Sequence, residues 1–194
     1  MPAGQGLGKP ARWNRAATPP AGVERGCGLG KSGLDVVKVG DRYTFARTVG
    51  ESDVMLFAGL TGDFSDTHVN EQYMRQRSSV GGRIAHGALL IGYMSTASTM
   101  SIAHVIHDDD LTDFPVSAGY DRIRFLRPVL LGDTVTVHYV VETVDKAGGR
   151  SIAGIEVSNQ RGELVAVGRH VMRWTRKLKA PVSPPSARVG ARRS

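Results

Sequence analysis

The chain has 194 residues, an ordinary globular content of 41% hydrophobic and 22% charged residues, and a formal net charge of +7. It has a single cysteine, Cys27, which excludes a disulfide framework and argues against a cysteine-based zinc site. The positive charge lies at the ends: residues 1–34 hold five Lys/Arg and one Glu (+4), residues 175–194 hold six Lys/Arg and no acid (+6), and residues 35–174 are therefore 14 − 17 = −3. An acidic centre argues against a nucleic-acid-binding fold.

The two ends are rich in Gly, Ala and Pro and have no hydrophobic period, so we predict basic disordered tails at residues 1–34 and 176–194. One domain is expected over residues 35–175. The first residues lack the apolar core of a secretory signal, and Ser, Thr and His interrupt the longest apolar segment, so we expect a cytoplasmic protein without a membrane span. The N-terminal segment contains Arg and few acids, which leaves a transit peptide open.

The first half of the domain predicts one strand and short helices. Residues 42–49 fit a strand, Ser52 is a candidate N-cap with Asp53 in the first helical turn, and Gly62 can end that helix. A second short helix is expected over residues 71–76. The apolar side of the first helix is expected to comprise Val54, Phe57, Ala58 and Leu60.

The second half predicts a long helix followed by a meander of strands. Residues 86–106 are apolar on most sides, which is typical of a helix buried on most sides. Alternation then predicts strands over residues 121–125, 134–142, 151–158 and 163–174, with a hairpin turn at residues 159–162. Helices followed by consecutive strands favour an α+β class with an antiparallel sheet. A buried helix about 30 Å long, at roughly 1.5 Å per residue, can be wrapped by such a sheet.

The informative segment is FAGLTGDFSDTH at residues 57–68, followed by GRIAHGALLIGYMS at residues 82–95. It resembles the signature of MaoC-like dehydratases and R-specific enoyl-CoA hydratases, in which an Asp precedes Asn-Pro-x-His and a His-Gly pair opens the central helix. The resemblance extends more loosely over residues 40–174. It implies a hot-dog fold, with a long buried central helix wrapped by a curved antiparallel β-sheet.

The resemblance also implies a site. Asp63 and His68 are the expected catalytic pair that holds one water, and Gly87 is the expected amide donor to the thioester carbonyl at a helix N-terminus, where backbone N–H groups lack partners. Ser95 and His86 are expected to contact substrate, although a helix-capping imidazole is the favoured interpretation of His86. Which residue of the catalytic pair removes the proton stays open.

One departure from the family pattern is that Ser65-Asp66 replaces Asn-Pro, which removes a fixed φ and adds a third ionisable group to the loop. If Asp66 turned inward, it would perturb Asp63 or His68 by charge. Other charged residues favour ordinary roles: a solvated turn at residues 108–110, and solvated loop charge rather than phosphate contacts for Arg75, Arg77 and Arg83. Surface or strand-face positions are expected for His104, His107, His138 and His170.

The sequence therefore predicts hydration of trans-2-enoyl-CoA, or the reverse dehydration of an (R)-3-hydroxyacyl-CoA. Coenzyme A would belong to the substrate, and no metal or other cofactor is expected. By the resemblance we expect a homodimer or higher homo-oligomer, and no nucleic-acid or membrane partner. Two alternatives stay open: a hot-dog acyl-CoA thioesterase, and a non-catalytic subunit that binds acyl thioesters, which the change at Ser65-Asp66 favours. Acyl chain length, and coenzyme A against a carrier protein, are not predicted.

Overall fold

The computed structural model describes residues 30–177, so most of the two predicted tails lies outside the described residues. Residues 30–34, assigned above to the N-terminal tail, pack against the domain. Lys31 forms an isolated parallel bridge with Leu111, and a 3-10 turn (Gly33–Asp35) capped by Ser32 buries Leu34 in the core.

Five antiparallel strands form one sheet in the order β1-β3-β4-β5-β2. The strands β3, β4 and β5 form the predicted meander, whose second hairpin turns at Gly162 with a positive φ of 75°. The strand β2 pairs with β5 and is much longer than the predicted residues 121–125. The bounds are β1 (Arg42–Thr48), β2 (Asp113–Phe125), β3 (Thr134–Asp145), β4 (Arg150–Asn159) and β5 (Leu164–Arg176).

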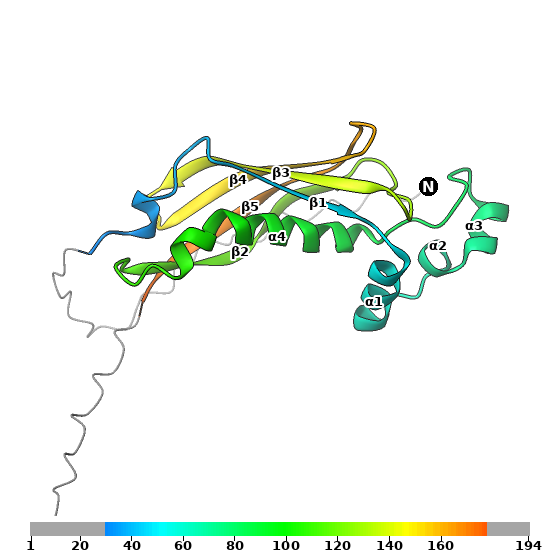
Figure 1. Cartoon of the computed structure of the whole chain (residues 1–194), viewed down its shortest axis with the longest axis horizontal. Helices are drawn as coiled ribbons and strands as arrows, with labels where there is room; N and C mark the ends of the chain where they lie inside the picture. Colours follow the sequence, from blue (N-terminus) through cyan, green and yellow to red (C-terminus); the bar gives the residue numbers. More distant parts are fainter. Residues whose placement is uncertain (1–29, 178–194) are drawn as a thin grey trace, which may run out of the picture.

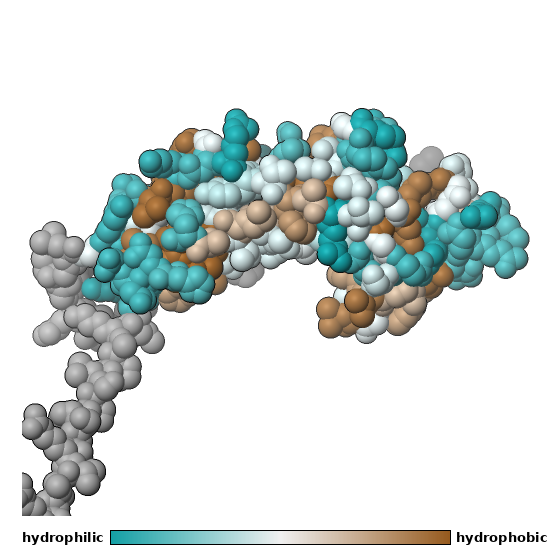
Figure 2. Space-filling view, in the orientation of Figure 1, coloured by the Kyte–Doolittle hydropathy of each residue, from teal (hydrophilic) through white to brown (hydrophobic). Residues whose placement is uncertain are grey.

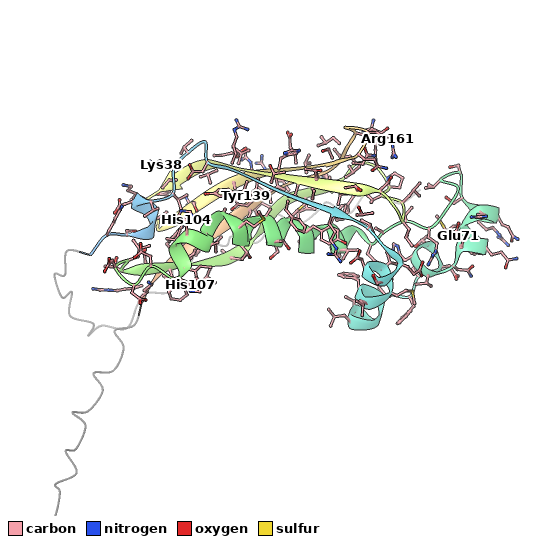
Figure 3. All side chains as sticks on the ribbon, in the orientation of Figure 1. Lys38, Glu71, His104, His107, Tyr139 and Arg161 are labelled. Carbon is pink, nitrogen blue, oxygen red and sulfur yellow. The ribbon has the colours of Figure 1, made fainter. Side chains whose placement is uncertain are left out.

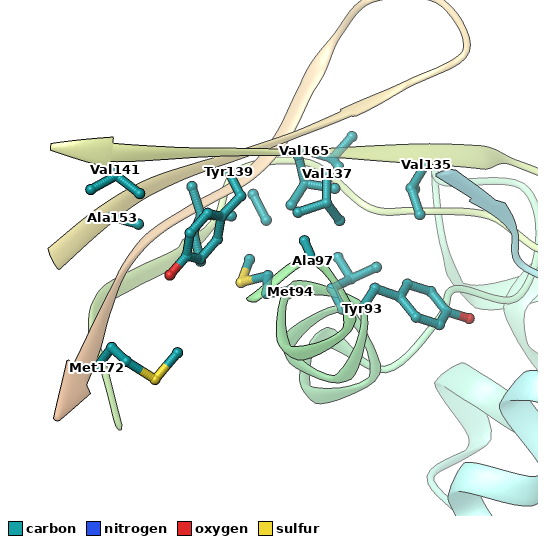
Figure 4. Close-up of a cluster of buried hydrophobic side chains, with 14 of the residues drawn as sticks. Tyr93, Met94, Ala97, Val135, Val137, Tyr139, Val141, Ala153, Val165 and Met172 are labelled. Carbon is teal, nitrogen blue, oxygen red and sulfur yellow. The ribbon is translucent and has the colours of Figure 1, made fainter. Parts of the chain in front are cut away.

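The core lies between this sheet and the long helix α4 (Gly87–Ile106), which runs along one face of the sheet (Figure 1). Tyr93, Met94 and Ala97 of α4 face the inner side chains of the sheet (Figure 4). The alternation predicted for β3 is confirmed, because Val135, Val137, Tyr139 and Val141 are all buried. Each such side chain contributes about 1.5–3 kcal/mol when it leaves water.

Burial of α4 on most sides was predicted, and this is wrong for the described chain. The buried residues of α4 form one stripe, and the opposite side is exposed, including Met100 and Ile106. The sheet covers only one side of the helix, and the other side carries mainly small residues such as Gly92 and Ser95.

Contrary to the sequence expectation, α4 is long and apolar enough to meet the minimum for a membrane-spanning helix. Core helices of soluble proteins meet the same minimum.

Three short helices lie at one end of the sheet, near the N-terminus of α4 (Figure 1). They are α1 (Glu51–Thr61), α2 (Asp66–Val69) and α3 (Glu71–Arg77); α3 was predicted and α2 was not. The N-cap of α1 is Gly50 rather than Ser52, because the Asp53 carboxylate accepts the Gly50 N–H at 2.8 Å and satisfies the helix start. Gly62 ends α1 as predicted, with a φ of 81°.

The outer side of α1 is apolar. Leu60, predicted to be inward, is 85% exposed, and Met55 and Leu56 are also exposed. Figure 2 shows hydrophobic surface gathered over α1 at the lower right. Val54 and Ala58 are the only buried residues of α1, because this helix contacts the body of the domain along a narrow strip.

Candidate active site

The loop that follows α1 brings a carboxylate and an imidazole together. Gly62 takes the left-handed conformation that lets the chain turn sharply out of α1. The short helix α2 follows and places His68 close to Asp63. One carboxylate oxygen of Asp63 and one nitrogen each of His68 and His86 lie within 4.8 Å of one another. A water that makes hydrogen bonds of about 2.8 Å to two atoms can bridge a separation of up to roughly 5.6 Å. Asp63 and His68 are therefore close enough to share one water.

A backbone carbonyl fixes the ring of His68. Its Nδ1 lies 2.8 Å from the carbonyl oxygen of Ile84. Because a carbonyl only accepts, Nδ1 must carry the proton, and in the neutral ring Nε2 is then an unprotonated acceptor. Sequence analysis missed Ile84, since every residue carries the same carbonyl and no side-chain pattern announces its use.

The imidazole of His86 does not cap the helix as expected. His86 occupies the N-cap position of α4, but its side chain makes no cap hydrogen bond within the described chain. The Nε2 atom instead donates to the main-chain carbonyl of Asp63 at 2.9 Å. The ring stacks on His68 with centroids 3.8 Å apart, and Phe57 packs near it with centroids 4.9 Å apart. His86 is buried, so little of its side-chain surface is available for direct contact with a substrate.

Gly87 begins α4 beside an apolar cavity of about 410 Å³. The first N–H groups of a helix lack intrahelical partners, so the Gly87 region offers amide donors with the helix dipole behind them. A Cβ at Gly87 would lie 2.6 Å from the Phe125 ring, so a larger residue at this position would require that ring to move. The cavity is lined by His68, Gly87 and the mainly apolar residues Val80, Ile84, Ala85, Leu90, Phe125, Leu126, Arg127, Pro128 and Val129.

Three predicted site residues lie outside this cavity lining, namely Asp63, Ser95 and His86. Asp63 is exposed beside it, in contact range of His68. Ser95 is exposed on α4, two turns beyond Gly87, and is absent from the residues that line the cavity. A larger hollow of about 740 Å³ lies over the opposite face of the sheet, with charged residues such as Arg42 and Glu156, and includes none of the predicted site residues.

At the departure from the family pattern, the extra carboxylate is bound by a neighbour of the same loop. Asp66 is exposed and its Oδ1 accepts a hydrogen bond from Asn70 Nδ2 at 3.0 Å. The Ser65 N–H donates to Oδ1 of Asp63 at 3.3 Å. Ser65 thus supplies an amide contact that orients the Asp63 carboxylate.

The cluster of Asp63, His68 and His86 contains three atoms of the kind that bind metal ions, but its geometry does not suit one ion. Imidazole lone pairs lie in the ring plane, and ligands must point at zinc from about 2.0–2.2 Å. The two rings are stacked with an interplanar angle of 28°, so their lone pairs run side by side instead of converging. We assign no ion to this cluster.

The remaining histidines and arginines serve other purposes. His104 and His107 are exposed at the C-terminal end of α4, far from α3 and Glu71 (Figure 3). His138 is exposed on a strand, whereas His170 lies on the inner face of β5 and is fully buried.

The expectation of solvated loop charge is wrong for Arg83, whose side chain is only 16% exposed. Arg83 pairs with Glu51 and with Glu71 and so joins α1 and α3 to the loop before α4. Arg75 also pairs with Glu71, but within α3, and its side chain stays exposed to solvent as expected. Their ion pairs occupy the groups that a phosphate would need.

Comparison with known proteins places these features in a family. Residues 36–162 match the family model described as "MaoC like domain". The (R)-specific enoyl-CoA hydratase of Rhodospirillum rubrum is 35% identical over 108 residues, which are 54% of this chain and 66% of that enzyme, just short of two thirds of its length. The solved R-hydratase PhaJ1 from Pseudomonas aeruginosa is 25% identical with a TM-score of 0.59, and the match covers 79% of this chain and 94% of that one.

A fluoroacetyl-CoA-specific thioesterase is 14% identical with a TM-score of 0.52, over 72% of this chain and 89% of that one, and so shares the fold alone. The predicted α+β hot-dog fold is confirmed by the five-stranded antiparallel sheet, the long helix and these structural neighbours.

Proposed function

The chain belongs to the MaoC-like domain family, and from that premise we propose that it is an (R)-specific hydratase of trans-2-enoyl thioesters, or the reverse dehydratase of (R)-3-hydroxyacyl thioesters. The observation that carries the proposal is the approach of the Asp63 carboxylate to the imidazole of His68 beside the amide end of α4. Asp63, His68 and Gly87 carry the reaction in this proposal.

In the hydration direction, Asp63 and His68 hold one water next to the β-carbon of the substrate. The contact with Ile84 supports His68 as the base: its Nδ1–H donates to the Ile84 carbonyl, which leaves the Nε2 lone pair to accept a proton. The water oxygen bonds to the β-carbon while one of its protons passes to Nε2 of His68, and the C=C electron pair moves toward the thioester oxygen to form an enolate. The enolate electron pair then returns to the α-carbon, which takes up one proton, so that one water has been added in all. Positioned proton transfer of this kind is worth about 10²–10⁴-fold in rate.

The thioester oxygen gains negative charge during this addition and needs a donor. The Gly87 amide at the start of the 20-residue helix α4 supplies one in the proposal, supported by the missing side chain and by the adjoining cavity. Removal of one such donor typically lowers kcat about 10²–10³-fold.

The cavity supports an acyl thioester as the substrate class. Its apolar lining fits an acyl chain, and its 410 Å³ falls within the range of about 300–1,000 Å³ usual for small-molecule sites. We propose acyl-CoA as the soluble substrate, without a metal or redox cofactor, and action in the cytoplasm as a homodimer or higher homo-oligomer. Ser95 and His86 complete the proposed site, Ser95 from the exposed side of α4 and His86 from behind His68.

The test is a turnover panel of trans-2-enoyl-CoAs of increasing chain length, beginning with crotonyl-CoA. Loss of the conjugated double bond and release of free thiol are measured in parallel. We expect hydration without thiol release, and loss of activity by at least about 100-fold in Asp63→Asn and in His68→Ala. Asp66→Asn is the matched control, since this carboxylate of the same loop faces Asn70 and should leave turnover within about two-fold.

The other outcomes contradict the proposal. Thiol release as the main reaction would make the protein a thioesterase. Tight acyl-CoA binding without turnover at any chain length would make it a non-catalytic binding subunit. Full hydration by Asp63→Asn or by His68→Ala would remove the assigned pair from the chemistry.

A further inference from the structure

His86 is buried, and the reaction proposed above gives it no proton to transfer. It nevertheless contacts both members of the catalytic pair. Its Nε2 donates to the main-chain carbonyl of Asp63, and its ring lies on the ring of His68 with centroids 3.8 Å apart. The residue next to it is Gly87, so one position joins the loop, the second imidazole and the start of α4.

The same arrangement leaves one polar atom of His86 without a partner. Because Nε2 must donate to a carbonyl, the neutral ring carries its lone pair on Nδ1. That Nδ1 is buried and has no hydrogen-bond partner in the described chain. A buried acceptor without a partner costs free energy, so a hydrophobic ring would suit stability better at this position.

We propose that His86 is a positioning residue, which fixes the Asp63 backbone by a hydrogen bond and the His68 ring by stacking, at the cost of an unpaired buried nitrogen. The inference rests on the proposed function. It adds an explanation of how the loop that carries Asp63 and His68 is held in position relative to α4. Phe57 of α1 also contacts the His86 ring, with centroids 4.9 Å apart. A displacement of about 1 Å in a reacting group can lower a rate by about 100-fold. Accurate positioning of the pair can therefore outweigh the loss of stability caused by the unpaired nitrogen.

Two substitutions separate the two contacts. His86→Phe keeps a planar ring for the stack and removes both the hydrogen bond and the unpaired nitrogen. His86→Gln keeps an N–H that can reach the Asp63 carbonyl and removes the ring. We expect His86→Phe to unfold at the same or a higher temperature than the wild type, to lose about 10–100-fold in kcat, and to keep KM within about three-fold. His86→Gln should recover part of the lost kcat.

His138→Phe is the matched control, because His138 is exposed on a strand and outside the cavity lining. It should leave kcat unchanged. A kcat of His86→Phe within two-fold of the wild type overturns the inference, as does a fall in melting temperature without a fall in kcat.

A second readout does not need activity. Long-range ¹H–¹⁵N NMR of the histidine rings in the wild type should show the Nε2–H tautomer for His86 and the Nδ1–H tautomer for His68, as their carbonyl partners require. An Nδ1–H tautomer at His86 contradicts the inference even if no enoyl thioester is hydrated. Absence of hydration by the wild type, with the expected tautomers present, would refute the proposed function and leave the positioning contacts standing.

Discussion

Acid sensitivity of folding is expected to depend on one core histidine. His170 is completely buried under the sheet, where its Nε2 lies 2.8 Å from Ser117 Oγ and its Nδ1 lies 2.9 Å from the Tyr139 hydroxyl. The Tyr120 ring packs beside it with centroids 4.6 Å apart. Burial lowers the pKa of His170 from 6.5 to about 4, because the charged form has lost its water. The fold therefore holds this ring neutral.

The direction of the pH effect follows from the two states. The unfolded chain protonates residue 170 below its ordinary pKa of 6.5, whereas the folded chain does so only near 4. The stabilising contribution is fully present above 6.5, and it declines as the pH falls toward 4. The difference between 6.5 and about 4 corresponds to about 3 kcal/mol in full, and most of it is lost between about pH 7.5 and about pH 4.5.

Urea unfolding of the wild type and of His170→Gln at these two pH values measures the contribution. The free energy of unfolding should fall by roughly 2–3 kcal/mol more in the wild type than in the variant. Carboxylates such as Asp133 titrate in both proteins: burial raises its pKa, but hydrogen bonds from Gln160, the Leu130 amide and Arg161 hold the pKa below its usual range. Their effect cancels in the difference. Parallel pH dependence in the two proteins would refute the assignment to His170.

Two further predictions concern the site. Gly87→Ala keeps the amide N–H but places a methyl group against the Phe125 ring, so kcat should fall about 10²-fold through displacement of the bound thioester, and stability should fall by about 1 kcal/mol because the half-exposed ring can move; Phe125→Leu in the same chain should restore stability more than kcat, and recovery of both together would locate the defect in packing alone. Arg83→Met removes the ion pairs with Glu51 and Glu71, so the melting temperature should fall while KM for acyl-CoA stays within about two-fold of the wild type. A large rise in KM at unchanged melting temperature would instead make Arg83 a phosphate contact.

The fold was predictable where burial follows a simple period. Alternation in residues 134–142 identified β3, because Val135 and Val137 face the helix while their neighbours face outward. The first half of β2 escaped detection, because Pro115 and Gly119 disfavour a strand locally. Pro115 is tolerated on β2 because this strand lies at the edge of the sheet, and a register shift in the ladder with β5 lies next to Gly119. The exposure of Leu60 was not predictable either, since it depends on how little of α1 meets the body of the domain.

The site was predictable to the level of which segments meet. Asp63, His68 and Gly87 were named from spacing and resemblance, and the structure brings their segments together at the N-terminus of α4. The direction of the His86 ring was not predictable, because an N-cap residue can turn its side chain forward to the helix or back to the preceding loop. The hydrogen bond between Asp66 and Asn70 was not predictable either, since it depends on how the two side chains are placed in the folded loop.

Incubation of crotonyl-CoA with the wild-type protein in ¹⁸O-labelled water, followed by chiral analysis of the product, tests the central claim most directly. If Asp63 and His68 deliver a bound water to the β-carbon, the product is (R)-3-hydroxybutyryl-CoA with the label on its hydroxyl oxygen. Label recovered in a free carboxylate would show attack at the thioester carbonyl, and an (S) product would show addition from the opposite face; either result contradicts the account.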